Sequence, residues 1–133
     1  MTAADGLQKA LVCTQAALDR KATDIVVLDV GSFTTIAEYL VLCTGRSDRQ
    51  VQSIAQSVEE RLRAERARPL AIEGLARGQW VLIDCGNVVV HVFQAATRTF
   101  YDLERLWQHA PRIELPEPLR SQAAESEARR AGG

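Results

Sequence analysis

Two short apolar runs separated by Gly86 and Asn87 constrain the fold of this chain more than any other feature of its sequence. Residues 80–85 (WVLIDC) and 88–93 (VVVHVF) are rich in β-branched side chains, and their length favours strands over helices. Glycine and asparagine both tolerate the positive φ that a two-residue hairpin loop requires. The sequence therefore predicts a tight antiparallel hairpin over residues 80–93.

The register of such a hairpin decides which side chains share a face, because side chains alternate along a strand. One face is wholly apolar and requires a cover of helices; it carries Val81, Ile83, Cys85, Val88, Val90 and Val92. The other face mixes large apolar and polar groups; it carries Trp80, Leu82, Asp84, Val89, His91 and Phe93. This mixture suits a protein-binding surface, and it also suits a face covered by the chain's own first helix or residues 34–37. Both alternatives stay open.

Periodic patterns in the rest of the chain predict how the hairpin is flanked. The apolar spacing indicates helices over residues 2–21, from Ser47 to Pro69, and through Phe100, Leu103 and Trp107. Ser47 and Gln50 have the spacing of a reciprocal N-terminal cap. Further strands are expected at residues 25–30, 39–43 and 69–73. The prediction is an α/β (α+β) protein with a mixed β-sheet of about five strands flanked by helices.

The length of 133 residues fits one domain, which we expect over residues 1–110. Residues 111–133 hold three of the four prolines and no aromatic side chain. That composition is typical of a solvated segment, so the sequence predicts a flexible C-terminal tail and no regular structure beyond about Arg112.

Composition and charge exclude several classes of protein. Hydrophobic residues make up 47% of the chain, enough to bury a core, and the net charge of −1 disfavours a dedicated nucleic-acid-binding domain. The start of the chain lacks a basic and apolar leader, and no apolar run approaches the ~20 residues of a membrane span, so a cytoplasmic protein is expected. Cys13, Cys43 and Cys85 are predicted to be reduced core residues. With only two histidines, no metal site is expected.

Three groups of residues are candidates for phosphate binding or catalysis. Residues 44–47 (TGRS) pass from a strand into a helix, which suits phosphate binding but is better explained by helix capping. Asp84 and His91 share a hairpin face, although no nucleophile is evident beside them. Asp24 and Asp29 are expected on opposite sides of their strand, which is a poor arrangement for two catalytic metal ions.

Two groups of arginines are candidates for binding a partner. Arg46 and Arg49 suit an acidic partner or a second copy of the chain. The four arginines between residues 61 and 68 have Glu59, Glu60 and Glu65 beside and between them. A solvated helix face with ion pairs is therefore favoured over contact with RNA.

Taken together, these segments resemble the ribosomal silencing factor (Iojap) family over residues 7–107. The motifs that carry the resemblance are residues 24–29 (DIVVLD), 43–45 (CTG), Ser47, 49–51 (RQV), 73–74 (EG), 80–84 (WVLID), 88–93 (VVVHVF) and 101–107 (YDLERLW). The chain departs from the family pattern at Glu38 and Asn87, where aspartate is common, and at Cys85, where a larger side chain is frequent.

The resemblance implies a nucleotidyltransferase-like topology without the catalytic carboxylates, hence no enzyme and no cofactor. It implies a translational repressor that binds the fourteenth protein of the large ribosomal subunit at the intersubunit face and sterically blocks joining of the small subunit under nutrient limitation. It also implies a homodimer, with no sequence-specific nucleic-acid binding and no membrane. The alternatives are a nucleotide-binding or nucleotidyltransferase-like enzyme and a large-subunit assembly factor.

Combined with the mixed hairpin face, the resemblance predicts a partner-binding patch. Its residues are Trp80, Leu82, Asp84, Val89 and His91, with Arg98 and Tyr101 at the edge where the last helix leaves the hairpin. Phe100, Leu103 and Trp107 are instead expected to secure that helix to the sheet.

Overall fold

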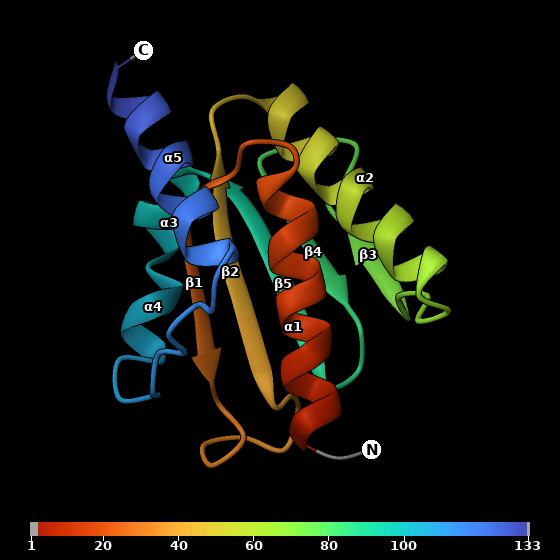
Figure 1. Ribbon diagram of the computed structural model, residues 1–133. Helices are drawn as coiled ribbons and strands as arrows, with labels where there is room; N and C mark the ends of the chain where they lie inside the picture. Colours follow the sequence, from red (N-terminus) through yellow and green to blue (C-terminus); the bar gives the residue numbers. More distant parts are fainter. Residues whose placement is uncertain (1–2, 133) are drawn as a thin grey trace.

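The computed structural model describes residues 3–132 and places a mixed five-stranded sheet at their centre (Figure 1). The strands lie in the order β1-β2-β5-β4-β3; β2 and β5 are parallel, and the other neighbours are antiparallel. The predicted mixed sheet with flanking helices is therefore confirmed. The elements are α1 (Ala3–Leu18), β1 (Thr23–Asp29), β2 (Tyr39–Gly45), α2 (Asp48–Ala64), β3 (Ala71–Glu73), β4 (Trp80–Asp84), β5 (Val88–Gln94), α3 (Ala95–Tyr101), α4 (Leu103–Leu106) and α5 (Leu119–Gly132).

The predicted hairpin forms between β4 and β5 with the predicted register. Ile83 lies opposite Val90, and the Cys85 N–H donates to the Val88 carbonyl at 2.9 Å. Gly86 has a φ of +86°, as a tight turn between twisted strands requires. The two faces of the hairpin are therefore those that the sequence analysis described.

Helices α1 and α2 cover the apolar face of the sheet, as the sequence predicted (Figure 1). Ser47 caps α2, because its Oγ accepts from the Gln50 N–H at 3.1 Å. The Gln50 side chain accepts in turn from the Arg46 N–H, one residue before the position expected for a reciprocal cap. α2 ends at Ala64 and does not continue to Pro69, because Arg66 turns the backbone into the left-handed region with a φ of +59°.

The opposite face of the sheet has a second, smaller core, over which the chain packs α3 and α4. The sequence predicted one continuous helix here, but Asp102 adopts a φ of +46° and divides it in two. The break changes the direction in which side chains point: Leu103 and Trp107 pack against the core as expected, whereas Phe100 is 79% exposed. The expectation that Phe100 secures the helix to the sheet is therefore wrong.

The C-terminal segment differs from the expected tail. The Pro111 carbonyl accepts from the Asp29 N–H at 2.9 Å, and the Ile113 N–H donates to the Val27 carbonyl at 2.8 Å, so this segment pairs with the outer edge of β1. Helix α5 then packs beside β1 and α1 (Figure 1). An open strand edge offers unpaired backbone groups, and the extended segment satisfies them despite its polar composition.

All three cysteines are buried and outside disulfides, which confirms their prediction as reduced core residues. Burial raises the pKa of the Cys43 thiol to about 12. Across residues 3–132, none of the helices combines the length and the apolar character needed to cross a membrane.

Candidate functional site

The face of the sheet opposite α1 and α2 is only partly covered, and a groove of about 370 Å³ remains on it. Strands β4 and β5 form its floor, residues 34–37 one wall, and α4 with Trp107 the other. The residues that line this groove are Thr34, Ile36, Ala37, Leu40, Glu73, Leu82, Asp84, Val89, His91, Leu103, Leu106 and Trp107. The alternative in which the first helix covers this face is wrong, because α1 lies on the other side of the sheet. Residues 34–37 do border the face, and α3 and α4 cover part of it.

Four of the predicted patch residues meet in this groove. Val89 and His91 are only 9% and 7% exposed and belong to its floor. Leu82 and Asp84 lie on the neighbouring strand β4, opposite His91 and Val89 respectively, and are half-buried. The side-chain alternation of the hairpin is thus what brings them together.

The two most exposed apolar side chains of the groove were not among the predicted residues. Ile36 is 80% exposed and Leu106 is 71% exposed, and they come from two separate segments that line the groove. Ile36 lies in a loop without periodicity, so the sequence carried no signal for it. Leu106 precedes Trp107 and falls outside the predicted stripe of Phe100, Leu103 and Trp107, which was the available signal that it points elsewhere.

An aromatic cluster adjoins the groove at His91. The Trp80 Nε1–H donates to His91 Nδ1 at 3.0 Å, and the Trp80 ring lies 4.9 Å from Tyr101 and 5.7 Å from Phe93. Tyr101 is 57% exposed. Trp80 and Tyr101 therefore lie next to the groove through His91, and neither is among the residues that line it.

His91 is neutral and holds Trp80 in place. Burial lowers the pKa of His91 from 6.5 to about 4, so the imidazole is uncharged at neutral pH. Because Nδ1 accepts the indole hydrogen bond, the ring proton lies on Nε2. The hydrogen bond orients the large Trp80 side chain. Because its pKa is lowered, His91 is too weak a base to suit general-base catalysis at neutral pH.

Asp84 stabilises the hairpin turn through its Oδ1, which accepts from the Gly86 N–H at 2.9 Å. In the register of the hairpin, Asp84 lies opposite Val89, and Leu82 lies opposite His91. The carboxylate thus orders its own turn, and no hydrogen bond between Asp84 and His91 is formed in the part of the chain that the structure describes. The geometry is that of a binding surface.

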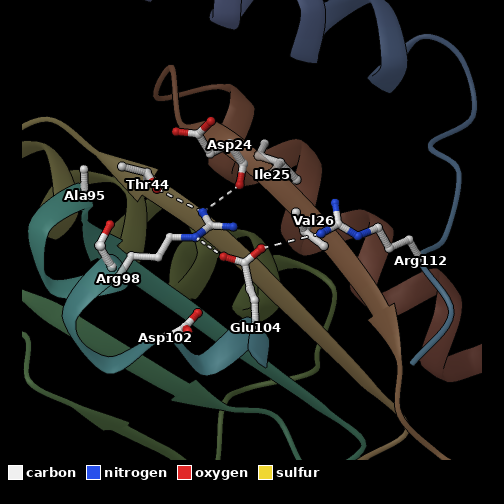
Figure 2. Close-up of a pocket in the computed structure, with 10 residues that line it drawn as sticks. Asp24, Ile25, Val26, Thr44, Ala95, Arg98, Asp102, Glu104 and Arg112 are labelled. Atoms are coloured by element: carbon white, nitrogen blue, oxygen red, sulfur yellow. Dashed lines mark hydrogen bonds and ion pairs between the residues drawn. The ribbon is translucent and has the colours of Figure 1, made fainter. Parts of the chain in front are cut away.

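Arg98 lies apart from the groove, in a polar cluster between α3, α4 and the start of β1 (Figure 2). Its Nε donates to Glu104 Oε1 at 2.8 Å, and its Nη1 donates to the Asp24 carbonyl at 2.7 Å and to Thr44 Oγ1 at 2.9 Å. The guanidinium also lies 5.5 Å from the centre of the Phe93 ring. The structure therefore brings Arg98 to the support of α3 and α4 and not to the predicted patch.

This polar cluster borders an open hollow of about 530 Å³, whose charges largely balance. Glu104 pairs with Arg98 and, at 3.8 Å, with Arg112 (Figure 2). The hydrogen bond from Arg98 lowers the pKa of the Glu104 carboxyl. Glu104 thus binds both arginines of the hollow, and the Asp24 carboxylate pairs with Arg130 at 2.9 Å. Among residues 3–132 no group of three or more His, Cys, Asp or Glu side chains is placed to hold a metal ion.

Fold and groove together define a small α+β protein with a half-open apolar groove on one face of its sheet and an aromatic cluster next to that groove. Comparison with known proteins assigns the family. The model of the family described as "Ribosomal silencing factor during starvation" matches residues 3–132. The chain belongs to the ribosomal silencing factor (Iojap) family.

Several relatives agree with this assignment. The chain is 39% identical to the ribosomal silencing factor RsfS of Bacillus subtilis over 110 residues, which cover 81% of this chain and 93% of that protein. It is 33% identical to the chloroplastic protein Iojap of Zea mays, over 85% of this chain and 49% of that protein. A crystal structure of a Chromobacterium violaceum protein, 34% identical, superimposes with a TM-score of 0.77 over 88% of this chain and 92% of that chain.

Family membership implies a role in silencing ribosomes during starvation and places this protein among non-enzymatic ribosome-binding factors. The prediction that the protein is not an enzyme is therefore confirmed. The capping interpretation of residues 44–47 is confirmed as well, since Ser47 Oγ is engaged by the helix that it begins.

Proposed function

We propose that this protein represses translation by binding the large ribosomal subunit through the groove and blocking the small subunit from joining. The docking point is the fourteenth protein of the large subunit, on the intersubunit face, and the effect lowers translation when nutrients are scarce. The single observation that carries the proposal is the groove itself, a preformed apolar hollow left open on a face that the chain otherwise covers.

The groove has the composition of a protein-binding surface. Ile36 and Leu106 present exposed apolar groups on its two walls, and burying each in a partner contributes about 1.5 to 3 kcal/mol. The floor is already rigid, because Val89 and His91 are buried in the sheet. A preformed surface avoids most of the entropy cost of ordering on binding.

The charge of the groove restricts the partner. Glu73 and Asp84 are the two ionisable acids along it, while its remaining lining is mostly apolar. The surface that fits carries apolar side chains to meet Leu106 and Ile36 and a basic group to meet the two carboxylates. Complementary charge of this kind sets orientation and association rate more than affinity.

The mechanism is steric exclusion. A folded domain docked on the intersubunit face occupies space that the small subunit needs, so binding of this protein and joining of the subunits compete. An interface of standard size buries about 1,600 Å², which supports affinities from micromolar to picomolar according to the quality of its anchors. No chemical step is required.

Sedimentation of mixed ribosomal subunits tests the proposal. Purified protein at saturating concentration should reduce the fraction of joined subunits, and the double variant Ile36→Arg with Leu106→Arg should restore joining. Both positions are exposed, so the variant should keep the wild-type melting temperature. Leu70→Arg is the matched control, because Leu70 is 75% exposed and lies outside the groove.

Undiminished joining with wild-type protein would refute the repressor function. Inhibition that survives in the double variant would place the docking surface elsewhere. If the protein is found mainly on immature large subunits in cells, the same groove serves subunit assembly and not silencing.

The proposal includes two further expectations from the family resemblance, a homodimer and a location in the cytoplasm. Sedimentation equilibrium of the purified protein tests the first, and a single species of monomer mass at high concentration would reject it. Fractionation of cells tests the second.

A further inference from the structure

A cluster of positive charge forms at the end of the molecule where α1 ends, α2 begins and α5 ends (Figure 1). Lys21, Arg46 and Arg129 border one small depression there, together with Arg130. All four side chains are exposed. Arg130 is neutralised by Asp24 and Glu127, at 2.9 and 2.8 Å. We call the other three the basic patch.

The three cations of the basic patch are uncompensated. Within residues 3–132, none of Lys21, Arg46 and Arg129 forms an ion pair, whereas Arg20, Arg61 and Arg63, near them on the surface or along α2, all do. They come from three separate elements, so no local helix pattern explains their approach. Like charges gathered on one surface repel each other, and an anion bound between them removes that cost.

The fold ties together the backbone segments that carry the basic patch. The Gln50 side chain donates to the Arg20 and Lys21 carbonyls, both at 3.2 Å, which ties the end of α1 to the start of α2. The buried Ser126 hydroxyl donates to the Ala22 carbonyl at 2.6 Å, which ties α5 to the same turn. The backbone segments that carry the three cations are therefore held next to one another.

We propose that the basic patch binds backbone phosphates of ribosomal RNA, as a second contact of this protein with the large subunit. The other residues around the depression are Thr23, Gln50 and Ser126, all polar. Protein interfaces bury apolar anchors and are poor in lysine, whereas interfaces with nucleic acid are polar and positive.

The low net charge of the chain does not oppose this inference. Non-specific attraction by a whole domain depends on its overall charge, but a docking contact depends on the local field at a phosphate, which is screened beyond a Debye length of about 8 Å. The basic patch and the groove share no lining residue, so they are two separate surfaces.

This inference rests on the proposed function for its location on the large subunit, and salt dependence tests it. Three phosphate contacts should weaken binding roughly 20- to 40-fold between 50 and 200 mM salt, from a slope of about −0.7 to −0.9 per contact. The variant that combines Lys21→Gln, Arg46→Gln and Arg129→Gln should lose most of this dependence and bind at least about 20-fold more weakly at 50 mM, since it gains no affinity over the wild type at 200 mM. The control combines Arg66→Gln, Arg68→Gln and Arg77→Gln, three exposed arginines elsewhere with the same change in net charge; it should behave as the wild type.

Equal salt slopes for the patch variant and the wild type on large subunits would overturn the inference and leave the proposed function intact. If wild-type protein fails to bind the subunit at all, the proposed function fails, and protein-free ribosomal RNA decides the inference alone. A salt-dependent complex between this RNA and the wild type, weakened in the patch variant, supports the inference. If the wild type forms no complex, or if the wild type and the patch variant bind equally, the inference is overturned. Displacement of the RNA by an equal charge concentration of polyglutamate would assign the basic patch to acidic proteins and also overturn it.

Discussion

Replacing Arg98 by methionine should destabilise the fold and deform the groove without touching a residue that lines it. Methionine is an unbranched side chain that removes every polar contact of the guanidinium, including its position 5.5 Å from the centre of the Phe93 ring. The Arg98 side chain is 11% exposed and makes three hydrogen bonds, to Glu104, Asp24 and Thr44. Its loss leaves the 6% exposed Thr44 hydroxyl without the guanidinium that it accepts from, and leaves the Glu104 carboxylate with only the longer ion pair to Arg112 at 3.8 Å.

The expected cost is about 3 kcal/mol. A hydrogen bond to a charged group contributes about 1.5 to 3 kcal/mol, and an unsatisfied buried partner costs about 1 to 3 kcal/mol. We take the lower part of the sum, because Glu104 is 31% exposed and water can solvate it. For a chain of this size, that loss lowers the melting temperature by roughly 10 °C.

Thermal unfolding followed by circular dichroism measures this loss, with Arg105→Met as the control. Arg105 lies on α4 beside Glu104, is exposed and forms no ion pair within residues 3–132, so its replacement should change the melting temperature by less than about 2 °C. Equal melting temperatures for the two variants would refute the role of Arg98. Because α4 supplies Leu106 to the groove, the Arg98 variant should also bind the large subunit more weakly than the Arg105 variant.

The same pair of variants has a predicted dependence on pH. Arg98 lowers the pKa of Glu104 below its ordinary value of 4.5 in the folded protein. The stability from this pair is therefore present above pH 4.5 and is lost as the pH falls through the folded pKa of Glu104. The difference in unfolding free energy between the Arg98 and Arg105 variants should shrink on acidification, and a constant difference would contradict the assignment of Glu104 as the main partner.

Two further predictions concern His91 and α5. The folded pKa of His91, about 4, lies below its ordinary value of 6.5, so the unfolded chain binds the proton first and stability falls as the pH is lowered from 6.5 to 4. Urea unfolding at pH 7.5 and 5 should show a loss of about 2 kcal/mol that His91→Asn lacks, and an equal loss in both proteins would refute it. Ser126→Ala removes the 2.6 Å hydrogen bond to the Ala22 carbonyl and should cost about 1 kcal/mol in the same assay; no cost would mean that α5 does not dock on this turn.

The hairpin of β4 and β5 was predictable from the sequence down to its register. Two residues that tolerate a positive φ stand between two β-branched runs, and side-chain alternation then determines which residues share each face. The Ser47 cap was predictable for the same reason, since the hydroxyl and the amide that it satisfies are three residues apart. In both cases the interacting groups are close in the chain, so a short window of sequence contains the whole interaction.

The family was also accessible from the sequence, because its motifs are short and occur in a set order. Part of the candidate site followed from the hairpin face: Leu82, Asp84, Val89 and His91 line the groove, and Trp80 adjoins it. Arg98 was grouped with them because it follows the hairpin in the chain. Its partners Asp24 and Thr44 are 74 and 54 residues away, and no local pattern announces them.

Tertiary structure alone decided how much of the sheet face stays open. The left-handed turn at Asp102 directs α4 over the second core and leaves Leu106 exposed at the groove that Ile36 also lines. The docking of α5, whose Ser126 bonds to Ala22 across 104 residues, likewise brings Arg129 beside Lys21. The sequence by itself determined the strands, the cap and the two hairpin faces, because each depends on backbone preferences and neighbours within a few residues. The groove and the basic patch form where segments distant in the sequence pack together. The free energy of that packing depends on both segments, so neither segment alone predicts it.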